Sequence, residues 1–398
     1  MKTTTEPSSI VFLVFPYGLS VGFATVTLPF LLIQHGFSVA AEASITAVGI
    51  SANIVRFVWA PLTDLTLSLH KWYLIGISFC AATLFLLCFI PLNNNSTGLL
   101  TAIVFLSQFA STFVVNPVGG FMAKTVAVEK KGRAGGWYQA GNLGGTGIGG
   151  GAGIWLSSHY SYQTAGVVLS ITMLACASAL YFVPHVYAEK GNNLKNRFKV
   201  LALEVKDLFR SPITLFTTAM IIAPIGIGAA SGIWSSVAAD WHAPTDTVAL
   251  VTGVLNGVAC VIGCVFGGWI ADKLGRWWAF FGSGTLMAMV TLTMSLSTFT
   301  PINYVGGVLL YAFIVGFAYA AFSAIVLHAI GKGMASTKYA LLSSFSNIPV
   351  VYMTVFDGWL HDKYNITTML RGETFLGLGF VIISIFVLSQ TRLNKIPT

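Results

Sequence analysis

The sequence predicts an all-α integral membrane protein with twelve transmembrane helices in two pseudo-symmetric halves of six. Three observations predict this fold class: the composition, a series of long apolar segments and an internal repeat. Of the 398 residues, 55% are hydrophobic and only 9% are charged. In soluble proteins about a quarter of the residues are charged, because the surface must be hydrated. The composition therefore places the chain among membrane proteins.

The apolar segments give the number of helices. A helix needs about 20 mostly apolar residues to cross the hydrocarbon core of a bilayer. We place such spans at roughly residues 9–34, 42–62, 72–91, 98–122, 134–157, 163–184, 213–238, 246–271, 277–298, 302–328, 336–358 and 372–391. The mostly polar residues ahead of the first span do not resemble a cleaved signal sequence, so we expect this span to remain in the membrane.

The distribution of Lys and Arg orients these spans. The loops after the first, third, fifth, seventh and ninth spans contain neither residue. The loops between them and the two ends of the chain contain most of the cations: Lys2, Lys71, Lys124, Lys130, Lys131, Arg133, Lys190, Lys195, Arg197, Lys199, Lys206, Arg210, Lys273, Arg276, Lys332, Lys338, Arg392 and Lys395. Lys363 and Arg371 lie on the opposite side. The positive-inside rule then predicts a bacterial inner-membrane protein with both termini cytoplasmic. It also explains the net charge of +8 without a nucleic-acid partner.

An internal repeat divides the spans into two halves. Residues 208 positions apart match in several places: Pro16 with Pro224, Gly18 with Gly226, Gly49 with Gly257, Asp64 with Asp272 and Gly76 with Gly284. We therefore predict an N-terminal six-helix bundle at 1–184, a cytoplasmic linker at 185–212 and a C-terminal six-helix bundle at 213–398. Duplicated halves are typical of transporters in which one half rocks against the other around a midplane site.

One loop carries a recognisable motif. Residues 268–276 read Gly-Trp-Ile-Ala-Asp-Lys-Leu-Gly-Arg, which resembles the G-x-x-x-D-[RK]-x-G-R signature of the major facilitator superfamily. A variant ends at Asp64 and follows Arg56 and Phe57. This variant and residues 338–344 resemble the AmpG-like branch, which contains muropeptide permeases, acetyl-CoA transporters and some siderophore permeases. The resemblance implies the fold of the superfamily and secondary transport.

The charged residues of this motif are candidates for a cytoplasmic gate: Asp64, Asp272, Lys273 and Arg276. Each carboxylate is expected to meet a helix N-terminus and basic loop residues in one conformation. In the alternative, the two acids are solvated loop residues.

Arg56 is a cation inside span two, about 12 Å deeper than Asp64. A charge at this depth costs several kcal/mol unless it is paired or faces water. Three roles remain open for Arg56: it attracts an anionic group of the substrate, reaches the cytoplasm or pairs within the gate.

Span five is rich in glycine between Gly141 and Gly153. Gly145, Gly147 and Gly150 match the spacing of a dinucleotide-binding loop, but no strand precedes them and the segment is an apolar helix. Glycines four residues apart instead allow helix backbones to approach closely. We predict that this face packs on a helix of the other half and slides as the halves rock.

Polar side chains at helical spacing indicate a central cavity. In the superfamily that the chain resembles, spans one, four, seven and ten line such a cavity, and polar stripes on spans four and ten fit this arrangement. The residues expected to line it are Tyr17, Arg56, Gln108, Thr112, Asn116, Tyr138, Asn142, Trp234, Asn256, Tyr311, Tyr319, Ser323 and Asn347. The alternative for each of them is an interhelical hydrogen bond.

Few ionisable groups are available to couple transport to protons. Residues 114–120 of span four read Val-Val-Asn-Pro-Val-Gly-Gly, whereas the branch often carries acidic residues there. The candidates are Glu42, Asp240 and Asp357 toward the outer ends of their helices and His328 toward an inner end. In the alternative, the outer acids are rim or capping residues.

These features predict a monomeric secondary active transporter (permease) that moves a polar or amphipathic organic solute inward by alternating access. A siderophore, a muropeptide or an acyl-CoA-like anion fits the branch, and proton symport or the membrane potential supplies the energy. A drug or metabolite efflux antiporter is the alternative within this class.

A membrane-embedded acyltransferase is the alternative from a different class. It would need catalytic groups gathered at one membrane face, whereas the seven His are scattered. We therefore predict no enzymatic activity, no cofactor and no metal site. The expected partners are the solute, membrane lipid and the coupling proton.

Overall fold

The computed structural model describes residues 4–127, 131–185, 194–208, 210, 212–330 and 341–390. Regular secondary structure in these ranges is helical throughout, without a β-strand. The predicted all-α fold is therefore confirmed. Residues 338–340, the start of the second branch segment, lie outside these ranges.

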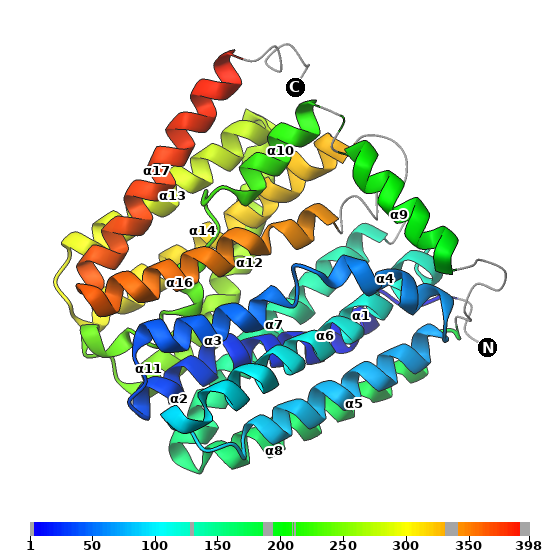
Figure 1. The fold of residues 1–398 in the computed structure, drawn as a ribbon, viewed down its shortest axis with the longest axis horizontal. Helices are drawn as coiled ribbons and strands as arrows, with labels where there is room; N and C mark the ends of the chain where they lie inside the picture. The colour runs from blue at the N-terminus through cyan, green and yellow to red at the C-terminus, as the bar shows by residue number, and fades with distance from the viewer. Residues whose placement is uncertain are drawn as a thin grey trace.

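The first eight α-helices form one bundle (Figure 1). Their bounds, with the short π and 3-10 segments, are α1 Ser9–Gly22, η1 Phe23–Thr27, α2 Leu28–Gln34, α3 Val39–Ser51, α4 Arg56–Leu65, α5 Leu69–Leu87, η2 Asn94–Ser96, α6 Thr97–Thr125, α7 Lys131–His159, α8 Tyr162–Ala175 and η4 Cys176–Phe182. Serine side chains fix several starts. Ser38 ahead of α3, Ser68 ahead of α5 and Ser161 ahead of α8 each accept a hydrogen bond from the backbone N–H three residues later, which is the usual N-cap geometry.

The helices after the linker form a second bundle. The linker contains α9 Leu194–Leu208. The second bundle consists of α10 Pro212–Ile222, η5 Ala229–Gly232, η6 Ala238–Trp241, α11 Thr245–Leu250, η7 Val251–Leu255, α12 Asn256–Leu274, α13 Arg276–Leu296, α14 Pro301–Ile330, α16 Asn347–Lys363 and α17 Ile366–Gln390.

Two of the predicted spans are interrupted. Residues 52–55 separate α3 from α4 within span two, and residues 223–228 follow α10 within span seven. In the second interruption, Gly226 has φ of 64° and Gly228 has φ of 69°. Glycine adopts this left-handed conformation without the steric cost that a Cβ imposes. The chain therefore leaves the helix at a point that its glycines allow.

Within the described ranges, nine helical segments are long and apolar enough to cross a membrane. The fifth, seventh and eleventh predicted spans are not among them. Glycine lowers the hydropathy of α7, span seven is interrupted, and α16 has 17 residues. The chain is a multi-pass membrane protein, and the nine segments are consistent with the twelve predicted spans.

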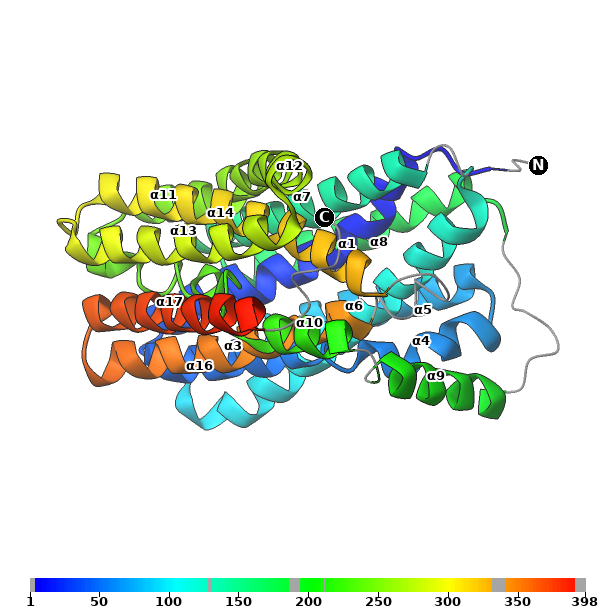
Figure 2. The same ribbon diagram turned by 90° about the horizontal axis from the view of Figure 1, so that it is seen from above.

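The two bundles meet at one end and separate at the other (Figure 1). We call the end with the turns at 35–38 and 364–365 the closed end, because α3 packs on α16 and α7 packs on α11 and η7 there. We call the opposite end the linker end, because α9 lies there beside α4. Figure 2 shows α13, α16 and α17 on one side of the molecule and α5, α8 and α9 on the other. The predicted orientation would place the linker end in the cytoplasm.

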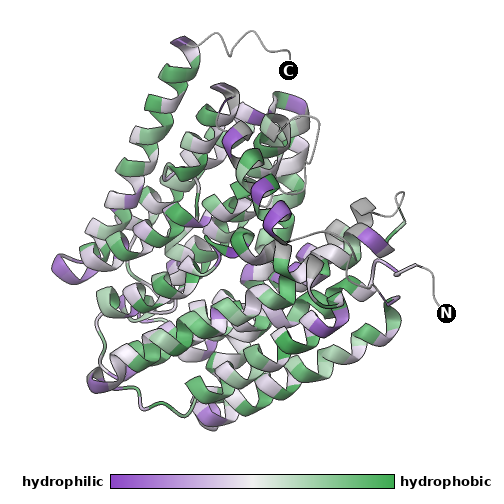
Figure 3. Cartoon of the chain, turned by 45° about the vertical axis from the view of Figure 1, so that its right-hand side comes forward, coloured by the Kyte–Doolittle hydropathy of each residue, from purple (hydrophilic) through white to green (hydrophobic). Residues whose placement is uncertain are grey.

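Hydrophobic residues predominate along the helices of both bundles (Figure 3), and many large apolar side chains are exposed. Ile171, Val265, Phe375 and Ile382 are between 62% and 72% exposed. Apolar surface of this extent is unfavourable in water and favourable against lipid. These faces therefore contact the acyl chains.

Glycine brings α7 against helices of both bundles. A Cβ on Gly149 would lie 2.3 Å from the carbonyl oxygen of Leu19 in α1, and a Cβ on Gly151 would lie 2.6 Å from that of Ala249 in α11. The prediction that span five packs on a helix of the other half is confirmed. Span one is a second partner, within the same half.

Replacing Gly149 with leucine is expected to destabilise the protein by about 3 kcal/mol, because the new side chain must displace the backbone of α1. The midpoint of thermal unfolding in detergent would measure this loss. Gly144→Leu is the matched control in the same helix, since a Cβ at Gly144 meets nothing within 4 Å. Equal losses for the two variants would contradict the close packing of α1 on α7.

Candidate functional site

Five polar residues from both bundles meet between them: Tyr17, Asn53, Arg56, Tyr319 and Ser343. We call them the central cluster. Nη2 of Arg56 donates a hydrogen bond to Oγ of Ser343 at 2.7 Å, which joins the two bundles. The Tyr17 hydroxyl donates to Oδ1 of Asn53 at 3.3 Å. Arg56 also lies within electrostatic range of the Tyr17 and Tyr319 hydroxyls.

The interruption of span two places Asn53 and Arg56 in this cluster. Between α3 and α4 the backbone forms tight turns, in which the Asn53 N–H bonds to the carbonyl three residues earlier. The helix resumes at Arg56, the first residue of α4. A continuous helix would direct these two side chains differently, because the turns change the rotation between them.

Tyr319 shows that the cluster borders an open space. It lies near the middle of α14, yet it is 56% exposed. A side chain that is exposed and also within range of Arg56 of the other bundle faces the space between the bundles and not the lipid. Tyr319 therefore fits the predicted cavity.

Arg56 carries a charge that its surroundings do not balance. No carboxylate whose side chain the structure describes forms an ion pair with it, and its partner Ser343 is neutral. A guanidinium has five N–H donors, so donors remain for another acceptor. A cation at this depth must face water or an anion, and the guanidinium is well shaped for a carboxylate or phosphate.

Two predicted cavity residues on span four do not line the cavity. Gln108 is 2% exposed and Thr112 is 0% exposed. Nε2 of Gln108 donates to the carbonyl oxygen and to Oγ of Ser20 in α1, at 3.2 and 3.1 Å. Oγ1 of Thr112 accepts from Nε1 of Trp59 in α4 at 2.9 Å. This face of α6 forms interhelical hydrogen bonds, which is the alternative that the sequence left open.

Trp234 and Tyr311 are also wrong as cavity residues. Both side chains are 0% exposed, and their rings pack edge to face with centroids 5.1 Å apart. They lie in the interior of the second bundle, where Tyr311 binds Glu373.

The other predicted cavity residues keep partly exposed side chains: Asn116, Tyr138, Asn142, Asn256, Ser323 and Asn347. Asn347 lies next to the central cluster, since its Nδ2 donates to the carbonyl oxygen of Ser343 at 3.2 Å. Contact of these six residues with a substrate stays a prediction.

The structure describes the predicted cytoplasmic gate only in part. The side chains of Asp64, Asp272 and the proton candidate His328 lie outside the described residues. Lys273 places its ammonium 4.5 Å from the centre of the Trp269 ring. Gly275 has φ of 93° and allows the sharp turn from α12 to Arg276 at the start of α13. The latch role of the four residues stays a prediction.

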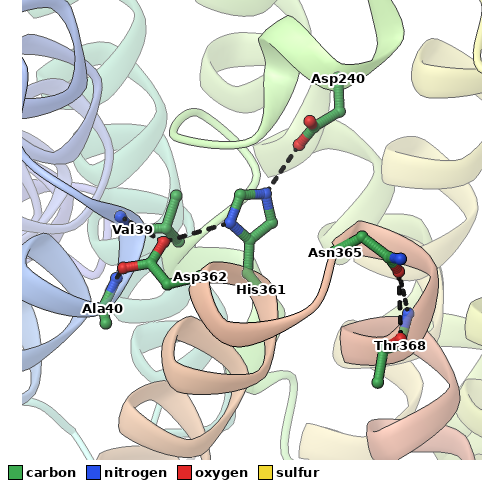
Figure 4. A network of polar contacts seen from close by, with 7 residues as sticks. All are labelled: Val39, Ala40, Asp240, His361, Asp362, Asn365 and Thr368. Atoms are coloured by element: carbon green, nitrogen blue, oxygen red, sulfur yellow. Dashed lines mark hydrogen bonds and ion pairs between the residues drawn. The ribbon is translucent and has the colours of Figure 1, made fainter.

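A polar network joins the bundles at the closed end (Figure 4). Asp362 of α16 accepts hydrogen bonds from the backbone N–H of Val39 at 3.0 Å and of Ala40 at 2.8 Å. Nε2 of His361 lies 2.9 Å from Oδ2 of Asp240, and its Nδ1 lies 3.4 Å from Oδ1 of Asp362. We call this network the closed-end latch. It supplies the first turn of α3 with an acceptor from the other bundle.

Asp240 belongs to this latch. Its side chain is 36% exposed, which fits the alternative of a rim residue. The alternative of a rim residue does not fit Glu42 and Asp357, which are both 0% exposed. The predicted span eleven ends at residue 358, whereas α16 continues to Lys363. The longer helix places Asp357 inside the bundle.

Glu373 is a buried acid that the sequence reading missed. Span twelve was expected to begin at residue 372, which would leave Glu373 at the membrane surface. The helix α17 begins at Ile366 instead, so Glu373 lies two turns inside it and is 7% exposed. Oδ1 of Asn365 accepts a hydrogen bond from the backbone N–H of Thr368 and caps the start of α17 (Figure 4). An Asn at this position is the sequence signal that could have placed the helix start correctly.

The helical bundles and the polar groups between them define a multi-pass membrane transporter. The profile of the Major Facilitator Superfamily matches residues 10–354. The chain belongs to this family.

Solved transporter structures share the fold over nearly the whole chain. The nucleoside transporter NupG has a TM-score of 0.68 at 12% identity, with 96% of this chain and 97% of that chain covered. A POT family transporter in complex with 5-aminolevulinic acid has a TM-score of 0.75 at 11% identity, with 97% and 96% covered. At these identities the likeness concerns the fold. A comparison with curated protein sequences finds no match.

Proposed function

We propose that the protein is a secondary active transporter that moves a polar or amphipathic organic anion inward across the bacterial inner membrane. The observation that carries this proposal is the unbalanced charge of Arg56 between the two bundles, beside Tyr17, Asn53 and Tyr319. A guanidinium with free donors attracts a carboxylate or phosphate. The tyrosines and amides add hydrogen bonds and aromatic surface for an organic body.

The two ends of the molecule support alternating access between residues 1–184 and 213–398 as the moving halves. At the closed end, the latch and the contact of Gly151 with Ala249 hold the bundles together. At the linker end the bundles separate (Figure 1). With the linker and both termini in the cytoplasm, this arrangement is the inward-facing state. Opening of the closed end would expose the central cluster to the outside.

The substrate class follows from the branch that the sequence resembles. In the AmpG-like branch, a siderophore, a muropeptide or an acyl-CoA-like anion would each present a negative group to Arg56. The related folds include a nucleoside transporter and a transporter in complex with 5-aminolevulinic acid, so this architecture accepts organic solutes. A monomer contains both halves and the whole cluster.

Counterflow into proteoliposomes tests the proposal. Labelled siderophores, muropeptides and acyl-CoAs are offered to vesicles preloaded with the unlabelled solute. We expect saturable counterflow of at least one anion, and none in protein-free vesicles. Absence of counterflow for every solute, together with turnover of a lipid substrate, would support a membrane-embedded enzyme instead.

A further inference from the structure

Two carboxyl groups are buried close together in the second bundle. Asp357 of α16 is 0% exposed, and Glu373 of α17 is 7% exposed. The two groups interact electrostatically. Both oxygens of Asp357 and Oε2 of Glu373 have no hydrogen-bond partner among the residues that the structure describes.

Tyr311 of α14 completes the group. Its hydroxyl donates to Oε1 of Glu373 at 2.5 Å and accepts a hydrogen bond from the backbone N–H of Ala230 at 3.2 Å. Tyr311 also lies within electrostatic range of Asp357. These three side chains therefore form one titratable cluster. We call Asp357 and Glu373 the pair.

Charged groups on the neighbouring helices have other partners or face the outside of the bundle. Glu42 of α3 accepts from Thr46 at 3.4 Å, and His361 of α16 pairs with Asp240. Arg371, two residues before Glu373, is exposed. Within the described part of the chain, no cation pairs with the two carboxyl groups.

This environment selects the protonated form of the pair. Two adjacent carboxylates repel each other, and burial away from water disfavours each negative charge. A proton on one carboxyl group removes the repulsion and provides an O–H donor for one of the unpartnered oxygens. With the closed end shut, burial and proximity therefore favour at least one proton on the pair.

Tyr311 connects the pair to the part of span seven that shuts the closed end. Ala230, its backbone partner, is the second residue of η5, the segment directly after the interruption at 223–228. Five residues later, Oγ of Ser235 donates to the carbonyl oxygen of Val26 in the first bundle at 2.9 Å. Movement of this segment at the closed end would pull on the hydrogen bond to Tyr311.

The helix of Asp357 forms part of the same closure. A Cβ on Gly358 would lie 2.6 Å from the Cβ of Ala43 in α3, so the next residue along α16 is in direct contact with the other bundle. Oγ1 of Thr354, one turn earlier, donates to the carbonyl oxygen of Ala229 at 3.5 Å. Separation of α3 from α16 would therefore open a path for water to Asp357.

We infer that Asp357 and Glu373 bind the proton that accompanies the solute during transport. When the closed end opens, water reaches the pair and one carboxylate takes a proton from the solution, forming one O–H bond. Closure buries the pair with this proton shared between the two carboxyl groups. The proton then leaves to water on the cytoplasmic side when hydration from the linker end reaches the pair. This inference rests on the proposed function, since it concerns the energy source of the same transport cycle.

The test separates exchange of solute from its accumulation. Reconstituted full-length protein is assayed with a labelled siderophore, muropeptide and acyl-CoA. Counterflow needs no net proton movement, whereas accumulation is driven by a pH gradient and recorded together with external alkalinisation. We expect the wild type to perform both. Glu373→Gln and Asp357→Asn should keep counterflow and lose pH-driven accumulation.

Asp246→Asn is the control, because that carboxylate lies at the closed end but is 72% exposed; it should keep both activities. Absence of counterflow in the wild type contradicts the proposed function. Counterflow in the wild type without pH-driven accumulation overturns the proton site alone. Full pH-driven accumulation in both variants overturns it as well.

A spectroscopic measurement covers the case in which these variants fail to fold. Infrared spectra of the reconstituted wild type should contain the carbonyl band of a protonated carboxyl group, which disappears as the pH rises. Tyr311→Phe should change this titration, because the hydroxyl no longer donates its hydrogen bond to Glu373. A titration that Tyr311→Phe leaves unchanged would overturn the inference.

Discussion

Replacing Arg56 with alanine is expected to reduce counterflow of an organic anion by about 10- to 100-fold. A hydrogen bond between charged groups contributes about 1.5–3 kcal/mol, and each 1.4 kcal/mol corresponds to about tenfold in affinity. In this structure Nη2 of Arg56 donates to a neutral hydroxyl, so the charge of Arg56 is available to the solute. Initial rates of counterflow at several solute concentrations would measure the loss.

Two further variants separate the possible roles of Arg56. Arg56→Lys keeps the charge without the planar fork and should recover part of the rate. Ser343→Ala removes the partner across the bundles, so it reproduces the loss if Arg56 acts in the gate and spares counterflow if Arg56 binds the solute. Arg371→Ala is the matched control, because Arg371 is exposed. Normal counterflow by Arg56→Ala would show that the cation has no role in the cavity.

The sequence predicted the fold from properties that do not depend on tertiary detail. Hydropathy and the placement of cations identify a multi-pass membrane protein, because the bilayer imposes the length and polarity of each span. The glycines of span five were predictable for a related reason. Close approach of two backbones excludes a Cβ, and Gly151 against Ala249 shows that exclusion directly.

The internal repeat did not predict the local backbone conformation of each half. Pro16 to Gly18 matches Pro224 to Gly226 in sequence, yet α1 continues through Pro16 while span seven leaves the helix at 223–228. A Cβ at Gly18 would lie 2.4 Å from the carbonyl oxygen of Asn142, so packing on α7 determines the path there. At Gly226 the positive φ shows a turn instead. The same three-residue pattern therefore serves packing in one half and a bend in the other.

The candidate site was the least predictable part, because periodicity shows which residues share a face but not what that face meets. Gln108 and Asn116 share a face of span four, but Gln108 bonds to Ser20 of α1. The depth of the acids was misjudged for another reason. The predicted span eleven ends five residues before α16 does, so Asp357 was placed toward an outer end although α16 buries it. Glu373 was missed because α17 begins six residues before the predicted span twelve.

Replacing Asp362 with alanine is expected to shift the protein toward a state in which the closed end is open. The first N–H groups of a helix have no partner within it. In α3, Ser38 serves Ala41 from the same bundle, whereas Asp362 serves Val39 and Ala40 from the other bundle. Loss of a capping acceptor costs about 1–2 kcal/mol, which corresponds to a change of about 5- to 30-fold in a two-state equilibrium.

Spin labels on the two bundles would measure this shift. Gln34 and Ile302 are exposed positions near the closed end, one in each bundle. After replacement of the five native cysteines, the Asp362→Ala protein should show a second, longer distance between the labels. Ser161→Ala removes the N-cap of α8, which lies within one bundle, so it should lower stability without the longer distance. The latch is a gate only if the two caps differ in this way, because only the bond from Asp362 must break when the bundles separate.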